Sequence, residues 1–292
     1  MTAWRLADRV LELPPPLAAG IVNASADSFF EGARSATPED AVERGLSLAS
    51  AGFDLLDVGA VPAASGPPVS VEEEAARLIP AVEGLALGAG VPLSVDTFQP
   101  EVARRALDAG AAAINDISGG GPEMWGLVGE RGCGYVLMHI EGPPRSGREP
   151  SGHADPVGDL VRWFSDRIEA AIGHGIAEEQ IALDPGLDFD LSVEDDLRIL
   201  AGLGQLRALG RPLFVALSRK DFLGAVLAGS WERRTPAVER EWATAAATAL
   251  AVAAGADVLR LHDRSALDAL RVAAAIQGVG RNAPDAAPAT RG

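Results

Sequence analysis

The sequence lacks cysteine pairs, long apolar runs and an excess of positive charge. Its one cysteine, Cys133, has no partner for an internal disulfide, which fits a reducing compartment. No apolar run reaches the roughly 18–20 residues needed to cross a bilayer. Charged residues and a run of prolines before residue 17 interrupt any signal-peptide core. We therefore expect a cytoplasmic protein.

Basic residues are also scarce. The 25 Lys and Arg residues stand against 41 Asp and Glu residues, which gives a net charge of −16. A protein that binds nucleic acid without sequence preference needs a basic surface, and anionic membranes attract basic segments. Both classes are therefore disfavoured, and an anionic substrate must be bound by a few local cations.

Several common site motifs are missing. No G-x-G-x-x-G follows the first expected strand, and no G-x-x-x-x-G-K-[ST] or G-x-S-x-G occurs. The four histidines show no H-x-x-x-H spacing, which disfavours a zinc site. The chain is long enough for two average domains or for one α/β barrel of about 250 residues.

Apolar runs of strand length alternate with helical stretches along residues 17–278. Near-continuous apolarity indicates burial on both faces, as in a parallel sheet. The expected strands are Leu17–Asn23, Asp54–Gly59, Pro92–Thr97, Ala112–Asp116, Tyr135–His139, Gln180–Asp184, Pro212–Ser218 and Asp257–His262. The clearest expected helices are Pro38–Ala51, Val71–Leu87, Pro100–Ala109 and Glu239–Ala254.

This alternation predicts an α/β fold, a (β/α)8 TIM barrel, over a single domain of residues 1–278. A doubly wound sheet is the alternative. Three expected helices end in Ala-Gly, as a C′ glycine requires. Residues 141–156 are expected to form a long loop. Residues 279–292, rich in Gly, Ala, Pro and Arg, are expected to form a disordered tail.

Polar residues end nearly every expected strand. One such residue usually only caps a helix or satisfies a turn. Their repetition predicts a ligand site at the barrel mouth, where the carboxyl ends of the strands converge. The strand-end residues are Asn23, Asp57, Asp96, Asn115, Asp116, Met138, His139, Asp184, Ser218, Arg219, Lys220, Arg260 and His262.

The residue types indicate two ends of one pocket. Asp96, Asn115 and Asp184 supply acceptors for a neutral ring rich in N–H donors. The cations Arg219, Lys220 and Arg260, with His262, come from the last two strands, the usual phosphate site of this fold, and indicate an anionic group. Asn23 is a candidate ligand of a Mg²⁺ ion that bridges phosphates. His139 either lines the pocket or packs beneath it.

The ordered motifs resemble those of the dihydropteroate synthase family over roughly residues 18–275. Each tripeptide alone is a weak signal, but the set occurs in the family's order and spacing. The motifs are Gly20-Ile21-Val22-Asn23 with Asp27-Ser28-Phe29, Ser94-Val95-Asp96-Thr97, Ile114-Asn115-Asp116-Ile117-Ser118-Gly119-Gly120, Leu137-Met138-His139, Leu183-Asp184-Pro185-Gly186, Ser218-Arg219-Lys220 and Arg260-Leu261-His262-Asp263.

The resemblance implies a pterin-binding TIM-barrel enzyme of folate biosynthesis. Such enzymes join 4-aminobenzoate to 6-hydroxymethyl-7,8-dihydropterin diphosphate and release pyrophosphate. It implies Asp96, Lys220 and Arg260 as catalytic residues. It also implies homodimers and Mg²⁺, with Asn23 as the metal ligand. By motif, the pterin would be held by Asp96, Asn115, Asp184 and Lys220, with Met138 and Phe189 against the ring. The diphosphate would be held by Asn23, Arg260 and His262, and Ser218 would lie near the aminobenzoate.

The departures from the family lie in the loops after the first, second and sixth expected strands. Asn23-Ala24-Ser25-Ala26-Asp27 replaces Asn-Val-Thr-Pro-Asp, and Gly59-Ala60-Val61-Pro62-Ala63-Ala64-Ser65 replaces a loop with Ser-Thr-Arg-Pro. Asp188-Phe189-Asp190-Leu191 replaces Gly-Phe-Gly-Lys. Arg34 and Arg219 are candidates for the missing loop arginine, and Asp188 and Asp190 would repel a benzoate if they faced it.

Two other functions stay open at this point. One is a divergent paralogue that binds pterins without making dihydropteroate. The other is a pterin-dependent methyltransferase, which would need no diphosphate site. The retained Arg260 and His262 disfavour the methyltransferase. A homodimer is expected by resemblance, and the Ala-rich helix at Glu239–Ala254 either packs on a partner or on its own barrel.

Overall fold

The computed structural model describes residues 2–24, 37–63, 66–146, 150 and 152–282. Its strands are β1 (Thr2–Arg5), β2 (Val10–Leu13), β3 (Leu17–Asn23), β4 (Leu55–Gly59), β5 (Leu93–Asp96), β6 (Ala113–Asp116), β7 (Gly134–Met138), β8 (Ile181–Asp184), β9 (Phe214–Ala216) and β10 (Val258–Leu261). Its α-helices are α1 (Pro38–Ala51), α2 (Val71–Gly88), α3 (Pro100–Asp108), α4 (Pro122–Arg131), α5 (Pro156–Gly173), α6 (Val193–Gly202), α7 (Asp221–Ala228), α8 (Glu241–Ala254) and α9 (Arg264–Asn282).

Strands β3 to β10 form one parallel sheet that curls into a barrel. The strand order is β8-β7-β6-β5-β4-β3-β10-β9, so each strand lies beside its neighbour in sequence. A parallel bridge between Leu183 and Leu213 joins the two end strands, and the Leu183 amide donates to the carbonyl of Pro212 at 2.8 Å. The (β/α)8 barrel is confirmed. A doubly wound sheet is excluded because its strand order would reverse.

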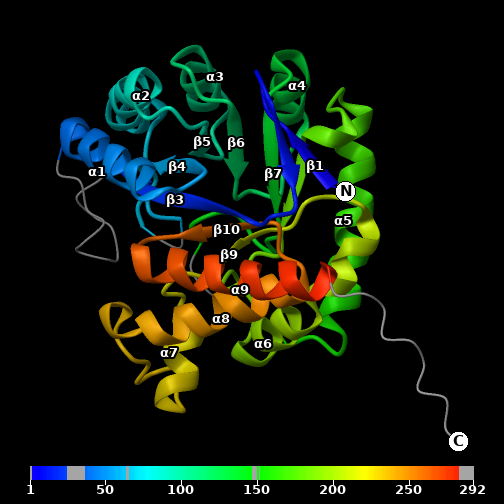
Figure 1. Cartoon of the computed structure of the whole chain (residues 1–292). Helices are drawn as coiled ribbons and strands as arrows, with labels where there is room; N and C mark the ends of the chain where they lie inside the picture. Colours follow the sequence, from blue (N-terminus) through cyan, green and yellow to red (C-terminus); the bar gives the residue numbers. More distant parts are fainter. Residues whose placement is uncertain (1, 25–36, 64–65, 147–149, 151, 283–292) are drawn as a thin grey trace, which may run out of the picture.

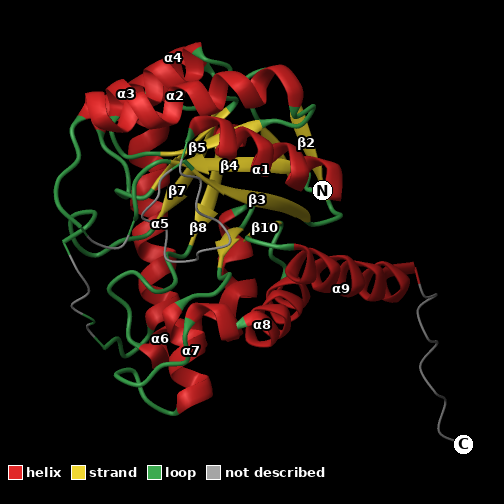
Figure 2. Cartoon of the chain, turned by 90° about the vertical axis from the view of Figure 1, so that its left-hand side faces the viewer, coloured by secondary structure: helices red, strands yellow, loops and turns green. Residues whose placement is uncertain are grey.

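All eight expected strands form, with bounds that differ from the expected ones by at most a few residues. They are buried on both faces. Helices cover the outside of the barrel, as Figure 2 shows, and the inward side chains of the strands pack against one another. The expected glycine helix ends are also confirmed. Gly52, Gly110 and Gly255 have φ values of +94°, +109° and +99°, in the left-handed region that glycine adopts at little cost.

Local sequence signals fix the start of α1. Thr37 accepts from the amide of Asp40, and the Asp40 carboxylate accepts from the amide of Thr37. This reciprocal capping box satisfies two amides that lack partners inside the helix. Pro38 follows at the first helical position, where a missing N–H costs nothing. Thr37 and Pro38 therefore fix the residue at which α1 begins.

The hairpin of β1 and β2 was not expected from the sequence. Its strands have only four residues each, too short for a clear alternating pattern. Trp4, Leu6 and Leu13 are buried against residues from the amino-terminal parts of the barrel strands, such as Ala19 and Phe214. The Trp4 indole donates to the carbonyl of Gln180 at 2.8 Å. The hairpin therefore packs on the barrel end opposite the expected ligand site.

The last helix extends four residues into the segment that was expected to be a disordered tail. The tail was expected to start at residue 279, yet α9 continues to Asn282 (Figure 1). The Gly and Arg content of residues 278–282 suggested a break, but the preceding helical turns continue through it. Residues 283–292 lie outside the described residues. Within the described part of the chain, no helix is long and apolar enough to cross a membrane.

The hairpin's contribution to stability can be measured with Trp4→Ala. The indole is fully buried, so its removal leaves a cavity and an unpaired Gln180 carbonyl. We expect the free energy of unfolding to fall by about 3–5 kcal/mol. Urea titration followed by circular dichroism measures this. Val10→Ala is the control because Val10 lies on the same hairpin and is 51% exposed. Equal stability of the two variants would show that the hairpin does not pack in the core.

Candidate active site

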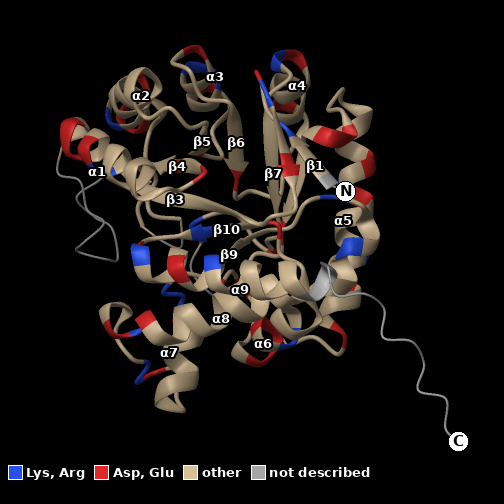
Figure 3. Ribbon diagram, in the orientation of Figure 1, with Lys and Arg blue, Asp and Glu red and all other residues tan. Residues whose placement is uncertain are grey.

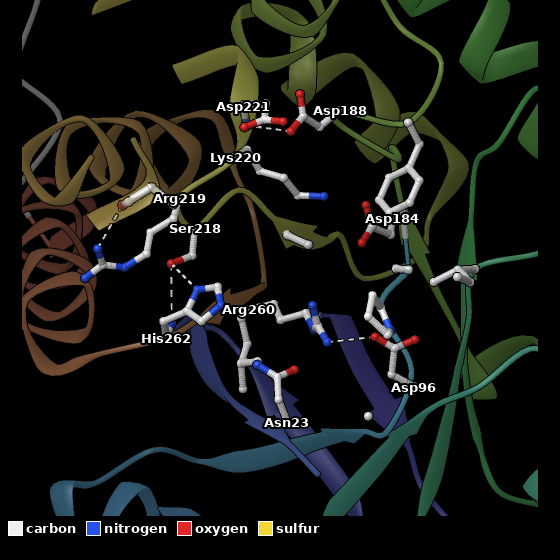
Figure 4. Close-up of a pocket in the computed structure, with 18 of the residues that line it drawn as sticks. Asn23, Asp96, Asp184, Asp188, Ser218, Arg219, Lys220, Asp221, Arg260 and His262 are labelled. Atoms are coloured by element: carbon white, nitrogen blue, oxygen red, sulfur yellow. Dashed lines mark hydrogen bonds and ion pairs between the residues drawn. The ribbon is translucent and has the colours of Figure 1, made fainter. Parts of the chain in front are cut away.

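The ten residues predicted to bind substrates or metal all line one pocket of about 510 Å³ at the carboxyl end of the barrel. They are Asn23, Asp96, Asn115, Met138, Asp184, Phe189, Ser218, Lys220, Arg260 and His262. Figure 4 shows Asp96 and Asn23 at one end of this space, and Asp188 and Asp221 at the other. The strand ends therefore converge as the sequence predicts.

Arg260 of β10 lies between two carboxylates. Its Nε donates to Asp57 at 2.5 Å, and its Nη2 donates to Asp96 at 2.8 Å. Figure 3 shows basic colour on β10 and acidic colour on β4, the strands that carry Arg260 and Asp57. Burial opposes the charge of Arg260, but Asp57 and Asp96 outweigh that effect and raise the pKa of Arg260. The guanidinium group is therefore a fixed positive charge in the pocket wall.

Asp57 is a positioning residue that sequence reasoning left without a role. It lies fully buried behind the pocket, and its Oδ2 also accepts from the Asn115 side-chain amide at 3.1 Å. That bond turns Asn115 Oδ1 away, and this buried oxygen has no partner among the described residues. The signal in the sequence was a charged residue inside a run of buried apolar residues, where carboxylates are rare unless paired.

Burial shifts the pKa values of the charged groups at the acceptor end of the pocket. Burial raises the pKa of Asp96 to about 7, although Arg260 opposes the shift. Burial also raises the pKa of Asp184 to about 6, and the amide of Gly186 at 2.9 Å from Asp184 Oδ1 partly offsets this. Burial lowers the pKa of Lys220. In Figure 4, Lys220 and Arg260 extend toward Asp184 and Asp96, so the four groups face one another across the same part of the pocket.

Apolar side chains form the flat wall beside these acceptors. Met138 and Ile117 pack with Phe189 in one small cluster. The Lys220 Nζ lies 4.3 Å from the centre of the Phe189 ring, within range of a cation–π contact. A planar ring between this wall and the carboxylates would stack on one side and donate hydrogen bonds at its edge.

The other predicted cations differ in how much positive charge they offer to a bound anion. Arg219 is paired with Asp263 at 2.5 Å and donates to the carbonyl of Ala237 at 3.0 Å, so its charge is largely compensated. Burial lowers the pKa of His262 to about 3, with further lowering by Arg260 and Arg219. His262 is therefore a neutral hydrogen-bonding group, 2.9 Å from Ser218 Oγ through its Nδ1. Arg260 is the main fixed cation at this end.

The sequence left open whether His139 lines the pocket or packs beneath it, and the structure shows that it packs beneath the pocket. It is buried and packs edge-on against Trp163, with ring centres 4.9 Å apart, and it does not line the pocket. Burial lowers the pKa of His139 to about 4, so it stays neutral beneath the site.

Comparisons with known proteins agree with this geometry. A family model described as "Pterin binding enzyme" matches residues 19–262. The chain is 36% identical over 251 residues to a dihydropteroate synthase of Synechocystis, covering 85% of each protein. It resembles the Xanthomonas albilineans dihydropteroate synthase with 4-aminobenzoic acid at a TM-score of 0.84 and 40% identity, covering 94% of this chain and 99% of that one. The same enzyme in complex with 7,8-dihydropteroate matches with a TM-score of 0.80, 40% identity and coverage of 94% and 98%.

The chain belongs to the dihydropteroate synthase family of pterin-binding enzymes. It is accordingly a transferase of folate biosynthesis with a TIM-barrel fold. The family resemblance seen in the strand-end motifs is confirmed, and it covers most of the chain.

The structure explains one departure from the dihydropteroate synthase motifs. Asp188 and Asp190 replace glycines and keep positive φ values of +74° and +59°. Aspartate tolerates this backbone region better than most residues. The Asp188 carboxylate accepts from the amides of Asp221 and Phe222 at 2.6 and 3.0 Å, so it caps the start of α7. Asp190 does not line the pocket. The expected repulsion of a benzoate is therefore reduced at both positions.

The second departure, the loop after β4, is held by a residue outside the family motifs. Val61, Pro62 and Ala63 line the pocket. Arg145 donates to the carbonyls of Pro62 and Pro67, the latter at 2.8 Å. This arginine braces the loop and does not line the pocket. The candidate Arg34 and the motif Asp27-Ser28-Phe29 lie outside the described residues.

The raised pKa of Asp96 makes pterin binding depend on pH. The carboxylate accepts from ring N–H groups only when ionised, and it becomes protonated as the pH falls through about 7. We expect the affinity for free 6-hydroxymethylpterin to fall by up to about tenfold per pH unit below that value. Calorimetric titration between pH 8 and 5.5 measures this.

Asp96→Asn is the matched variant for the pH experiment. The amide cannot titrate and presents one donor where the ring needs an acceptor, so we expect binding to be lost at every pH. An affinity that stays constant from pH 8 to 5.5, or that survives in Asp96→Asn, would remove Asp96 from the pterin site.

Proposed function

We propose that the pocket condenses 6-hydroxymethyl-7,8-dihydropterin diphosphate with 4-aminobenzoate and releases pyrophosphate. The observation that carries this proposal is the single pocket in which hydrogen-bond acceptors lie at one end and a fixed cation lies beside them. Structures of the Xanthomonas albilineans relative with 4-aminobenzoic acid and with 7,8-dihydropteroate support it.

The pterin ring would lie against Met138 and Phe189, with its N–H edge toward Asp96, Asp184 and Asn115. The unpartnered Asn115 Oδ1 supports this placement, because a buried amide oxygen without a partner costs free energy that a ring N–H would recover. Lys220 would donate to a ring oxygen or nitrogen from the opposite side.

The diphosphate would lie near Arg260, His262 and Asn23. A Mg²⁺ ion keeps several waters and takes only one or two protein ligands when it binds phosphates. The described residues contain no cluster of three or more His, Cys, Asp or Glu side chains that would hold a metal alone. One amide oxygen from Asn23, together with diphosphate oxygens, fits that donor set. When bound, the ion would neutralise negative charge on the leaving group.

The reaction would pass through a pterin cation. The bond between the hydroxymethyl carbon and its oxygen breaks, and the electron pair leaves with pyrophosphate. The carboxylates of Asp96 and Asp184 stabilise the positive charge that spreads into the ring, while Arg260 stabilises the leaving group. The amine of 4-aminobenzoate then forms the new C–N bond with its lone pair, and the resulting ammonium group gives its extra proton to solvent. The mechanism requires no covalent bond to the enzyme.

The test is pyrophosphate release from the pterin diphosphate with and without 4-aminobenzoate, and with Mg²⁺ present or chelated. We expect release to require both additions. In Asn23→Ala we expect the Mg²⁺ concentration for half-maximal rate and the KM for the diphosphate substrate to rise by about tenfold. The affinity for free pterin should not change.

Asp96→Asn is the control for the metal ligand. It removes the ring acceptor, together with one of the two carboxylates that hold Arg260, and leaves Asn23 unchanged. Pyrophosphate release that ignores 4-aminobenzoate would contradict the proposed condensation. An unchanged Mg²⁺ requirement in Asn23→Ala would contradict the proposed metal ligand.

We also propose that the protein forms a homodimer through α8 and α9. These two helices lie side by side (Figures 1 and 2) and expose large apolar side chains. Trp242 of α8 is 82% exposed, and Ile276 of α9 is 68% exposed. Leu250, Val272 and Val279 on the same two helices are also more than half exposed. Several exposed large apolar side chains on two neighbouring helices are typical of a protein interface.

Sedimentation velocity tests the dimer. We expect the native protein to sediment as a dimer at micromolar concentration and the double variant Trp242→Glu, Ile276→Glu as a monomer, because two buried charges would face each other across the interface. Leu87→Glu on α2 is the control, since Leu87 is 91% exposed on another face. A native protein that sediments as a monomer would overturn this proposal.

A further inference from the structure

Four arginines line the pocket among the described residues, and their side chains differ in how far they are exposed to a ligand. Arg219, Arg240 and Arg260 have side chains that are 8%, 5% and 17% exposed, and each is bound to a carboxylate within the fold. Arg234, from the segment between α7 and α8, is 36% exposed. It is therefore the arginine of the pocket wall that an entering ligand reaches most easily.

Arg234 is held in place on two sides. Its guanidinium carbon lies 4.7 Å from the centre of the Trp231 ring, and its Nη1 donates to the Trp231 carbonyl at 3.1 Å. Its Nε lies 3.1 Å from Asp221 Oδ1. The Nη2 group has no hydrogen-bond partner among the described residues. Stacking and two polar contacts fix the plane of the guanidinium, and one edge stays available for a second acceptor.

The charges around Asp221 do not cancel. Its Oδ1 also lies 2.7 Å from Arg240 Nη1, so one carboxylate stands between two guanidinium groups. Burial opposes ionisation of Asp221, but its bonds to Arg240 and Arg234 lower its pKa, so it stays negative. The group of Arg234, Asp221 and Arg240 therefore carries one net positive charge. Glu232 also lines the pocket, but it is exposed and its charge is screened by solvent.

The amides at the start of α7, which could otherwise bind an anion, are already bonded to Asp188. The start of α7 would offer free amides to a carboxylate. Here both oxygens of Asp188 accept from the amides of Asp221 and Phe222. Figure 4 shows Asp188 and Asp221 together at the end of the pocket away from Asp96. An anionic group at this end must therefore use a side-chain cation.

We propose that Arg234 binds the carboxylate of the arylamine substrate and makes the enzyme select anionic arylamines over neutral ones. This rests on the proposed condensation. The substrate carboxylate would accept from Arg234 and complete an alternating row of two carboxylates and two guanidinium groups. The amine at the opposite end of the substrate would then point toward the pterin at Asp96 and Asp184.

The test compares 4-aminobenzoate with 4-aminobenzamide, which has the same ring and amine but no charge. In Arg234→Gln we expect the ratio of kcat/KM for the acid to kcat/KM for the amide to fall by about tenfold, the size expected for one charged hydrogen bond that is partly exposed. The KM for the pterin diphosphate should stay within about twofold of the native value, since that end of the pocket is untouched. Arg234→Lys should keep part of the selectivity.

Arg233→Gln is the matched control. Arg233 is the preceding residue, is exposed and does not line the pocket, so its variant should keep the native ratio. An unchanged ratio in Arg234→Gln would overturn the proposal. An equal loss on the acid and the amide would also overturn it, because that pattern indicates a structural role.

A binding measurement separates this inference from the proposed reaction. Calorimetric titration of the two amines into protein saturated with free pterin and pyrophosphate measures Arg234 without turnover. The inference holds if 4-aminobenzoate binds more tightly than 4-aminobenzamide to the native protein but not to Arg234→Gln. If the same protein releases no pyrophosphate, only the proposed condensation fails. Equal affinity of the native protein for both amines would overturn the inference.

Discussion

Arg260 joins strands that lie apart in the barrel. It stands on β10, and its guanidinium group donates to Asp57 of β4 and Asp96 of β5. In the sheet, β3 separates β10 from β4, and both β3 and β4 separate β10 from β5. Removing one partner of such a buried pair typically costs about 3–5 kcal/mol, because the remaining charge stays uncompensated. The three side chains therefore hold one another in place. The mouth of the barrel can keep a fixed arrangement of charge although the loops around it differ from those of the family.

Asp57 extends this constraint to the pterin end. One of its oxygens accepts from both Arg260 and Asn115, so a carboxylate outside the pocket sets the direction of two groups inside it. The cation that would face the leaving group and the amide oxygen that would face the ring share one anchor. Preorganised groups of this kind stabilise developing charge without rearranging during the reaction. The catalytic layout thus depends on a residue that touches no substrate.

Much of the fold was predictable because burial on both faces leaves near-continuous apolar strands, and the polar residue at the end of each strand is easy to locate. The candidate site followed from the same reasoning, since parallel strand ends converge. The hairpin that covers Ala19 and Phe214 was not predictable, because its short strands become stable only by packing on the finished barrel. Arg234 was not predictable either. Its contact with Asp221 depends on how the segment after α7 folds back, and no local pattern encodes that.

Two acids at the second-substrate end of the pocket have partners within the fold. The acid at position 188 takes the free amides of α7, which in turn removes them as an anion site. The acid at position 221 would add a second negative charge at the same end of the pocket, and Arg234 and Arg240 both bind it. The charge of Asp188 also favours the charged form of the neighbouring Lys220. Each acid therefore has its own partners, and removing the acid at position 221 would leave two arginines without their carboxylate. The acids at the second-substrate end are therefore balanced within the fold, by the amides of α7 and by Arg234 and Arg240, while Asp96, Asp184 and Arg260 stand at the pterin end.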